Sequence, residues 1–138
     1  MKSSETEAYA YLTITADTLT LDDITNFLGV VPDGSNWSLG DLRKVPNKLR
    51  PTYEFSRWSL SSGVSKGQPL EDHFVGLCRK MTPLADKLYS LPDEMRPMIS
   101  ITGWVPTLEA SLVFSAGTLC EMSTFGIRLD FDLYSEND

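Results

Sequence analysis

Cysteine and histidine are scarce in this chain of 138 residues, and their scarcity disfavours several kinds of site. The two cysteines, Cys78 and Cys120, lie far apart and inside apolar patterns, which is the spacing of neither a disulfide scaffold nor a zinc site. We expect both to be buried free thiols. The one histidine, His73, precedes Cys78 by five positions, about 140° around a helix, so the two do not face a common substrate. We therefore expect no metal, no cofactor and no Cys–His nucleophile.

Long apolar runs are also missing. No run approaches the ~20 residues that span a bilayer, and the start, MKSSETEAYA, lacks the apolar stretch of a signal peptide. The sequence contains no phosphate-binding glycine loop and no nucleophile-elbow serine. We expect a cytoplasmic protein that forms one domain over residues 1–138, has no membrane contact and is not an enzyme.

What the chain does contain is a repeat of one segment near its two ends. Residues 10–19, AYLTITADTL, match residues 110–119, ASLVFSAGTL, at five positions without a gap. Apolar residues alternate in both copies, as in a strand with one buried face. Thr20 and Thr118 then offer capping hydroxyls for helices that end at glycines 29 and 126. Each copy thus predicts a strand followed by a helix.

A second strand follows each helix, at YEFSRWSL (53–60) and from residue 127 to 133. We expect Trp58 to be a core residue. Between the halves, apolar residues spaced three and four apart predict a helix over 70–91, kinked or divided at Pro83, followed by the strand MISITGWV (98–105), which turns back as a hairpin.

These elements predict an α+β fold. Two strand-helix-strand halves, about 8–62 and 108–135, would form a ferredoxin-like plan, with a helix and strand inserted at about 68–106. We expect an antiparallel sheet of about five strands with the helices on one face.

Charge is distributed unevenly along the chain. The net charge is −7, yet residues 41–66 carry +4, which leaves −11 for the rest. An acidic body attracts basic partners and repels nucleic acid, which we do not expect to bind. The basic segment could instead hold an anion, or its charges could simply be solvated. Its candidate contact residues are Trp37, Arg43, Lys44, Lys48, Arg50 and Arg57.

Two carboxylates share one face of the last strand. Asp130 and Asp132 alternate with apolar residues, so they lie about 7 Å apart on the polar side. Two such groups could divide acid and base roles. Arg128 lies beside them, which favours a solvated or partner-facing surface.

The order of these pieces is similar to that of a known family. The segments ADTLTLDDITNFLGVVP, LGDLRK, WSLSS, LEDHFVGLCRKMTPLADKL and GIRLDFDLY together resemble a family of small bacterial domains of unknown function, four-two-seven-nine in that series. The resemblance covers nearly the whole chain and implies no active-site residues.

The hypothesis that follows is a noncovalent binding domain. We expect a protein-binding module with a basic partner, and by analogy of size and charge a toxin-neutralising immunity protein. A small-molecule or anion sensor is the alternative, and an enzyme using Asp130 and Asp132 is the third. Whether open sheet edges pair into a homodimer stays open.

Overall fold

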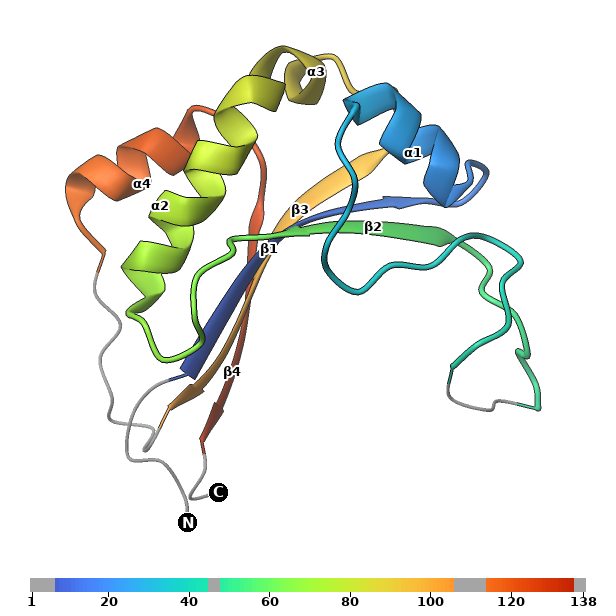
Figure 1. The fold of residues 1–138 in the computed structure, drawn as a ribbon, viewed down its shortest axis with the longest axis horizontal. Helices are drawn as coiled ribbons and strands as arrows, with labels where there is room; N and C mark the ends of the chain where they lie inside the picture. Colours follow the sequence, from blue (N-terminus) through green and yellow to red (C-terminus); the bar gives the residue numbers. More distant parts are fainter. Residues whose placement is uncertain (1–6, 45–47, 106–113, 136–138) are drawn as a thin grey trace.

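A computed structural model describes residues 7–44, 48–105 and 114–135 of the chain (Figure 1). Within these ranges, one sheet contains four strands in the order β2-β1-β3-β4. β1 pairs antiparallel with both β2 and β3, whereas β4 pairs parallel with β3. The strands are β1 (Glu7–Ala16), β2 (Ser56–Ser61), β3 (Arg96–Val105) and β4 (Leu129–Ser135).

All the helices lie on one face of this sheet, as the sequence predicts, and the other face carries none in the described ranges (Figure 1). They are α1 (Leu21–Leu28), α2 (Leu70–Met81), the short 3₁₀ helix η1 (Thr82–Leu84), α3 (Ala85–Tyr89) and α4 (Ala116–Ser123). The fold is therefore α+β, with one helical layer. None of the helices seen here combines the length and apolar character that crossing a membrane requires.

Buried apolar residues at every second position of β1 place the core under the helices. Even-numbered residues of β1 are buried from Ala8 to Ala16, and Leu12 and Ile14 are fully enclosed. Their partners in register include Trp58 of β2 and Ile99 of β3, which are also fully buried. The odd-numbered residues of β1 therefore point to the helix-free face.

The helix ends follow local signals. Thr20 caps α1 by accepting from the Asp23 N–H at 3.1 Å, and Asp23 accepts from the Thr20 N–H at 2.9 Å. α1 ends at Gly29, whose φ of +73° favours glycine. Pro83 divides the predicted long helix into α2, η1 and α3, as expected.

Two predictions about the last helix are wrong. Ser115, not Thr118, caps α4, because its Oγ accepts from the Thr118 N–H at 3.1 Å. Cys78 is buried as expected, but Cys120 is exposed, because it lies on the outer side of α4. Burial raises the pKa of the Cys78 thiol to about 11, so it stays protonated at neutral pH.

The prediction of an antiparallel sheet with a ferredoxin-like plan is wrong in one respect, because β4 is parallel to β3. The chain passes from β3 to β4 through α4, and a helical crossover of this kind joins parallel strands. The fifth expected strand, at 110–114, falls almost entirely outside the described residues. β2 also starts later than expected, at Ser56, so Tyr53 and Phe55 precede it.

Candidate binding face of the sheet

The helix-free face of the sheet carries a row of aromatic side chains. Tyr134 of β4 stacks on Trp104 of β3 with ring centroids 5.7 Å apart. Trp104 meets Tyr9 of β1 edge to face at 5.8 Å, and Tyr9 lies 6.4 Å from Tyr11. We call Tyr9, Tyr11, Trp104 and Tyr134 the aromatic row. It crosses three strands, and at its β4 end Tyr134 is 52% exposed.

Two carboxylates lie beside the β4 end of the aromatic row. Asp130 and Asp132 are both exposed, and they pair in register with Ser100 and Thr102 of β3. Neither takes part in an ion pair within the described ranges. The prediction that they share one strand face is confirmed. With Arg128 beside them, they leave a net charge of −1 at this end of the sheet.

Two other carboxylates on the same face, Asp17 and Glu7, are already paired. Arg96 of β3 donates two hydrogen bonds to the Asp17 carboxylate, each of 2.9 Å. The hydrogen bond from Arg96 lowers the pKa of Asp17, so the pair stays charged at neutral pH. At the start of β1, Glu7 lies 3.8 Å from the Lys66 ammonium group. Of these carboxylates, Asp130 and Asp132 therefore stay available to a partner within the described ranges.

At its β1 end the aromatic row borders a hollow. Its volume is about 350 Å³, and Tyr9 and Tyr11 form one wall. Asp33, Ser35, Ser61 and Ser62 also line the hollow. The aromatic row and this hollow together form a continuous surface from β4 to the end of β2.

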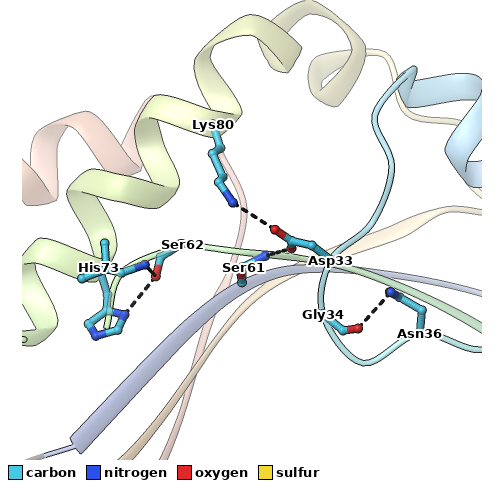
Figure 2. A network of polar contacts seen from close by, with 8 residues as sticks. Asp33, Gly34, Asn36, Ser61, Ser62, His73 and Lys80 are labelled. Carbon is cyan, nitrogen blue, oxygen red and sulfur yellow. Dashed lines mark hydrogen bonds and ion pairs between the residues drawn. The ribbon is translucent and has the colours of Figure 1, made fainter. Parts of the chain in front are cut away.

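The loop 33–37 forms the outer wall of this hollow and covers the free edge of β2 (Figure 2). The Ser59 carbonyl accepts from the Asp33 and Gly34 N–H groups at 3.0 Å each. The Ser59 N–H donates to Asn36 Oδ1 at 2.7 Å, and the Ser61 N–H donates to Asp33 Oδ1 at 2.6 Å. These bonds satisfy the outward backbone groups of β2, so this edge is not open to another strand.

Asp33 also ties the loop to the helical layer. Its Oδ2 accepts from Lys80 Nζ of α2 at 3.0 Å (Figure 2). Burial alone would raise the pKa of Asp33, but the hydrogen bonds from Ser61 and Lys80 outweigh burial and lower it. The carboxylate is therefore ionised at neutral pH, and it holds the loop in place from two sides.

Replacing Gly34 by alanine is expected to lower the free energy of unfolding by about 1–3 kcal/mol, the usual range for overpacking. A Cβ at this position would lie 2.7 Å from the Ser59 Cβ and 3.3 Å from Tyr11 Cδ1. Urea denaturation measures the loss. Gly67→Ala is the matched control, because a Cβ there meets nothing within 4 Å. Equal stability of the two variants would show that the loop does not pack on β2 this closely.

A buried serine–histidine pair lies next to the hollow. His73 of α2 is 0% exposed, and its Nδ1 lies 2.9 Å from Ser62 Oγ (Figure 2). Ser62 Oγ also accepts from the Val64 N–H at 3.2 Å. A hydroxyl bonded to an imidazole is the arrangement of a nucleophile and its base, but both side chains are enclosed and Ser62 is only 6% exposed. We interpret the pair as a structural bond between α2 and the chain after β2.

The basic residues lie at the other edge of the molecule, in an arm that leaves β2 (Figure 1). This arm, described over residues 37–44 and 48–57, is held by bridges between Trp37 and Arg57 and between Leu42 and Thr52. The structure thus separates the two groups of predicted contact residues, because β2 and β4 are opposite edges of the sheet.

Stacking organises the base of the arm. Trp37 and Tyr53 stack with centroids 4.4 Å apart and an interplanar angle of 10°. Arg43 lies over the Tyr53 ring at 4.9 Å, and Arg57 lies over the Trp37 ring at 5.3 Å. Arg43, Tyr53, Trp37 and Arg57 form what we call the stacked column. Three predicted contact residues therefore have a structural role, whereas Lys44, Lys48 and Arg50 are exposed farther along the arm.

The site has no metal-binding arrangement. Within the described part of the chain, no group of three or more His, Cys, Asp or Glu side chains is placed to hold a metal ion. Asp130 and Asp132 thus stand as a pair, without the further ligands that a protein site for a divalent cation uses.

The chain was compared with protein families, curated proteins and solved structures. The model of a family described as a domain of unknown function, DUF4279, matches residues 6–136. No curated protein and no solved structure matches the chain. The match spans nearly the whole sequence and confirms the resemblance seen in its motifs: the chain belongs to the DUF4279 family.

Proposed function

We propose that this domain binds a basic polypeptide noncovalently through the helix-free face of its sheet. One observation carries the proposal: the aromatic row lies beside two exposed, unpaired carboxylates on a face that no described helix covers. Covering a basic surface of another protein is the mechanism that a toxin-neutralising module would use. The proposal therefore retains the protein-binding hypothesis and assigns it to a surface.

Both parts of this surface attract cationic side chains. Lysine and arginine bind over the faces of tryptophan and tyrosine rings, and carboxylates accept short, charge-assisted hydrogen bonds from them. Trp104 is 36% exposed, so its ring is accessible beside Asp130 and Asp132. The net charge of −7 also speeds the approach of a basic protein at low salt.

The extent of the surface favours a polypeptide over a small ligand. The aromatic row runs over β4, β3 and β1 before it reaches the hollow. A ligand that contacted Tyr134 and Tyr11 together would have to span three strands, or roughly 10 Å. A peptide segment does this with two or three side chains.

Replacing Asp130 and Asp132 together by asparagine is expected to weaken binding of a labelled hexa-arginine peptide about tenfold, or 1.4 kcal/mol. Fluorescence anisotropy measures the dissociation constant, at low and at high salt. The control is Asp86→Asn with Glu121→Gln, which removes the same charge from exposed positions on α3 and α4. Equal weakening in both variants would show that net charge alone attracts the peptide, and absence of binding to the wild type would contradict the proposal.

Whether the basic arm takes part in peptide binding is tested with the same assay. Lys44→Glu with Lys48→Glu removes exposed positive charge and leaves the stacked column untouched. We expect this variant to bind the hexa-arginine peptide with the same dissociation constant as the wild type, and with an equal or higher association rate. If it lost peptide binding, the helix-free face would not be the binding surface.

An enzyme using the two carboxylates would require activity that Asp130→Asn and Asp132→Asn abolish.

A further inference from the structure

β4 is the open edge of the sheet. In the described ranges it pairs with β3 alone, whereas the loop 33–37 covers the outer edge of β2. The Ile99 N–H donates to the Arg128 carbonyl at 2.9 Å. Backbone groups alternate in direction along a strand, so residues 128, 130, 132 and 134 bond to β3. The N–H and C=O groups of Leu129, Phe131 and Leu133 therefore point away from the sheet.

The side chains of these same three residues are unusually exposed. Leu129, Phe131 and Leu133 lie on the helical face, in register with Ile99, Ile101 and Gly103, yet they are 38%, 42% and 47% exposed. The apolar residues of β1 on that face are all buried. Within the described ranges, β4 thus presents apolar side chains and unpaired backbone groups along one edge.

A second hollow lies between α4 and β4. Its volume is about 290 Å³, and its walls are mostly apolar, formed by Leu119 and Met122 of α4 with Ile127 and Leu129. A hollow of this size accepts one or two aliphatic side chains. It lies where a side chain from a strand added beside β4 would reach the helical layer.

We propose that an extended segment of the basic partner adds to the sheet as a strand at the β4 edge. This inference rests on the proposed function. It adds that, in the partner segment that binds, basic residues alternate with apolar ones. Added strands lie about 4.8 Å away, with facing Cβ atoms roughly 5 Å apart. Basic side chains would then face Asp130 and Asp132, and apolar ones would pack on Leu129, Phe131 and Leu133. Strand addition of this kind combines main-chain bonds with side-chain specificity.

Charge favours this occupant over a second copy of the chain. Two β4 strands placed edge to edge would bring together four carboxylates, from Asp130 and Asp132 of each copy, with the two Arg128 side chains, which leaves a net negative charge there. Like charges on facing strand positions are destabilising, and each chain already carries −7. A basic segment meets the same edge with opposite charge.

A proline at position 131 tests the edge directly. Phe131→Pro removes an outward N–H and leaves the bonds between β3 and β4 in place. Phe131→Ala removes the same side chain and keeps the N–H, so it is the matched control. For a labelled peptide of alternating lysine and leucine, we expect Phe131→Pro to bind about tenfold more weakly than Phe131→Ala. Thermal melting of both variants checks that the fold is retained.

N-methylated peptides give a second measurement on the wild-type protein. One lysine–leucine peptide is methylated on the leucine nitrogens and another on the lysine nitrogens, so each loses the hydrogen-bond donors of one edge. We expect one peptide to lose binding and the other to keep it. Equal binding of both, together with equal affinity of the proline and alanine variants, would overturn strand addition.

The outcomes also separate this inference from the proposed function. If hexa-arginine binds and depends on Asp130 and Asp132 but the proline and N-methyl tests show no difference, the face binds basic peptides without strand addition. If no basic peptide binds, the proposed function fails and the inference fails with it. A dimer of the chain alone in light scattering, lost in Phe131→Pro, would show that a second copy occupies the edge and would overturn the inference.

Discussion

Trp58→Ala is expected to lower the free energy of unfolding by about 3–5 kcal/mol, the usual loss when a buried aromatic ring is truncated. Trp58 is 0% exposed, and it is the largest fully buried side chain in the described part of the chain. It lies on β2 opposite Ile14 and shares the buried face of the sheet with it. Domains of this size are stable by about 5–15 kcal/mol, so this one substitution removes a large share. Urea denaturation followed by circular dichroism measures it.

Trp58→Phe separates the volume of the ring from its polar atom. The indole Nε1 has no hydrogen-bond partner in the described part of the structure. A buried donor without a partner costs about 1–3 kcal/mol, and phenylalanine removes that donor while it keeps a six-membered ring. We therefore expect a much smaller loss than for alanine. Equal losses in the two variants would show that the cavity is not the cause.

The first half of the fold is predictable from the sequence because its signals are local. The capping box of Thr20 and Asp23 and the glycine at position 29 lie at the ends of α1. Alternation along β1 places its even-numbered residues in the core, and Trp58 is a core residue as expected. Each of these features depends on residues close together in the chain.

The direction of β4 is not a local property. The period of residues 127–133 predicts a strand, and β4 forms over Leu129–Ser135. The same period does not say which strand will be its neighbour. The crossover through α4 makes β4 parallel to β3, and this follows only from the path of the chain between them. The sequence also leaves the start of α4 undecided, because Ser115 and Thr118, three residues apart, both offer a capping hydroxyl.

The aromatic row was missed for the same reason. Its members come from three strands, and only the pairing of Trp104 with Glu7 and with Tyr134 brings them together. One signal was present in the sequence: Tyr9 and Tyr11 occupy the phase of β1 opposite to its buried alanines and leucine. Aromatic residues on the outward phase of a strand indicate a contact surface. Asp130 and Asp132 could be predicted because they lie on one strand.

Acidification is expected to destabilise the protein from about pH 6.5 downward, because of His73. Burial lowers the pKa of His73 below its ordinary value of 6.5, although hydrogen bonding to the Ser65 backbone and the charge of Asp72 oppose this shift. The unfolded chain therefore binds a proton at a higher pH than the folded chain. Stability is complete above pH 6.5 and falls as the pH drops, by at most about 1.4 kcal/mol per pH unit for one proton. Urea denaturation at a series of pH values measures the slope.

Carboxylates change the stability in a lower pH range than His73, so the loss of stability below pH 6.5 can be assigned to one of the two. The hydrogen bonds to Asp17 and Glu71 lower the pKa of each, and those to Asp33 outweigh its burial, so these groups lose their contribution only below about pH 4.5. His73→Gln removes the titration and keeps a side chain that can hydrogen-bond to Ser62 Oγ. We expect this variant to show a flat profile between pH 6.5 and about 5, the window in which the histidine alone changes charge. A wild-type profile as flat as that of the variant would mean that His73 accepts its proton without leaving the core. A slope that persists in His73→Gln would assign the effect to another group.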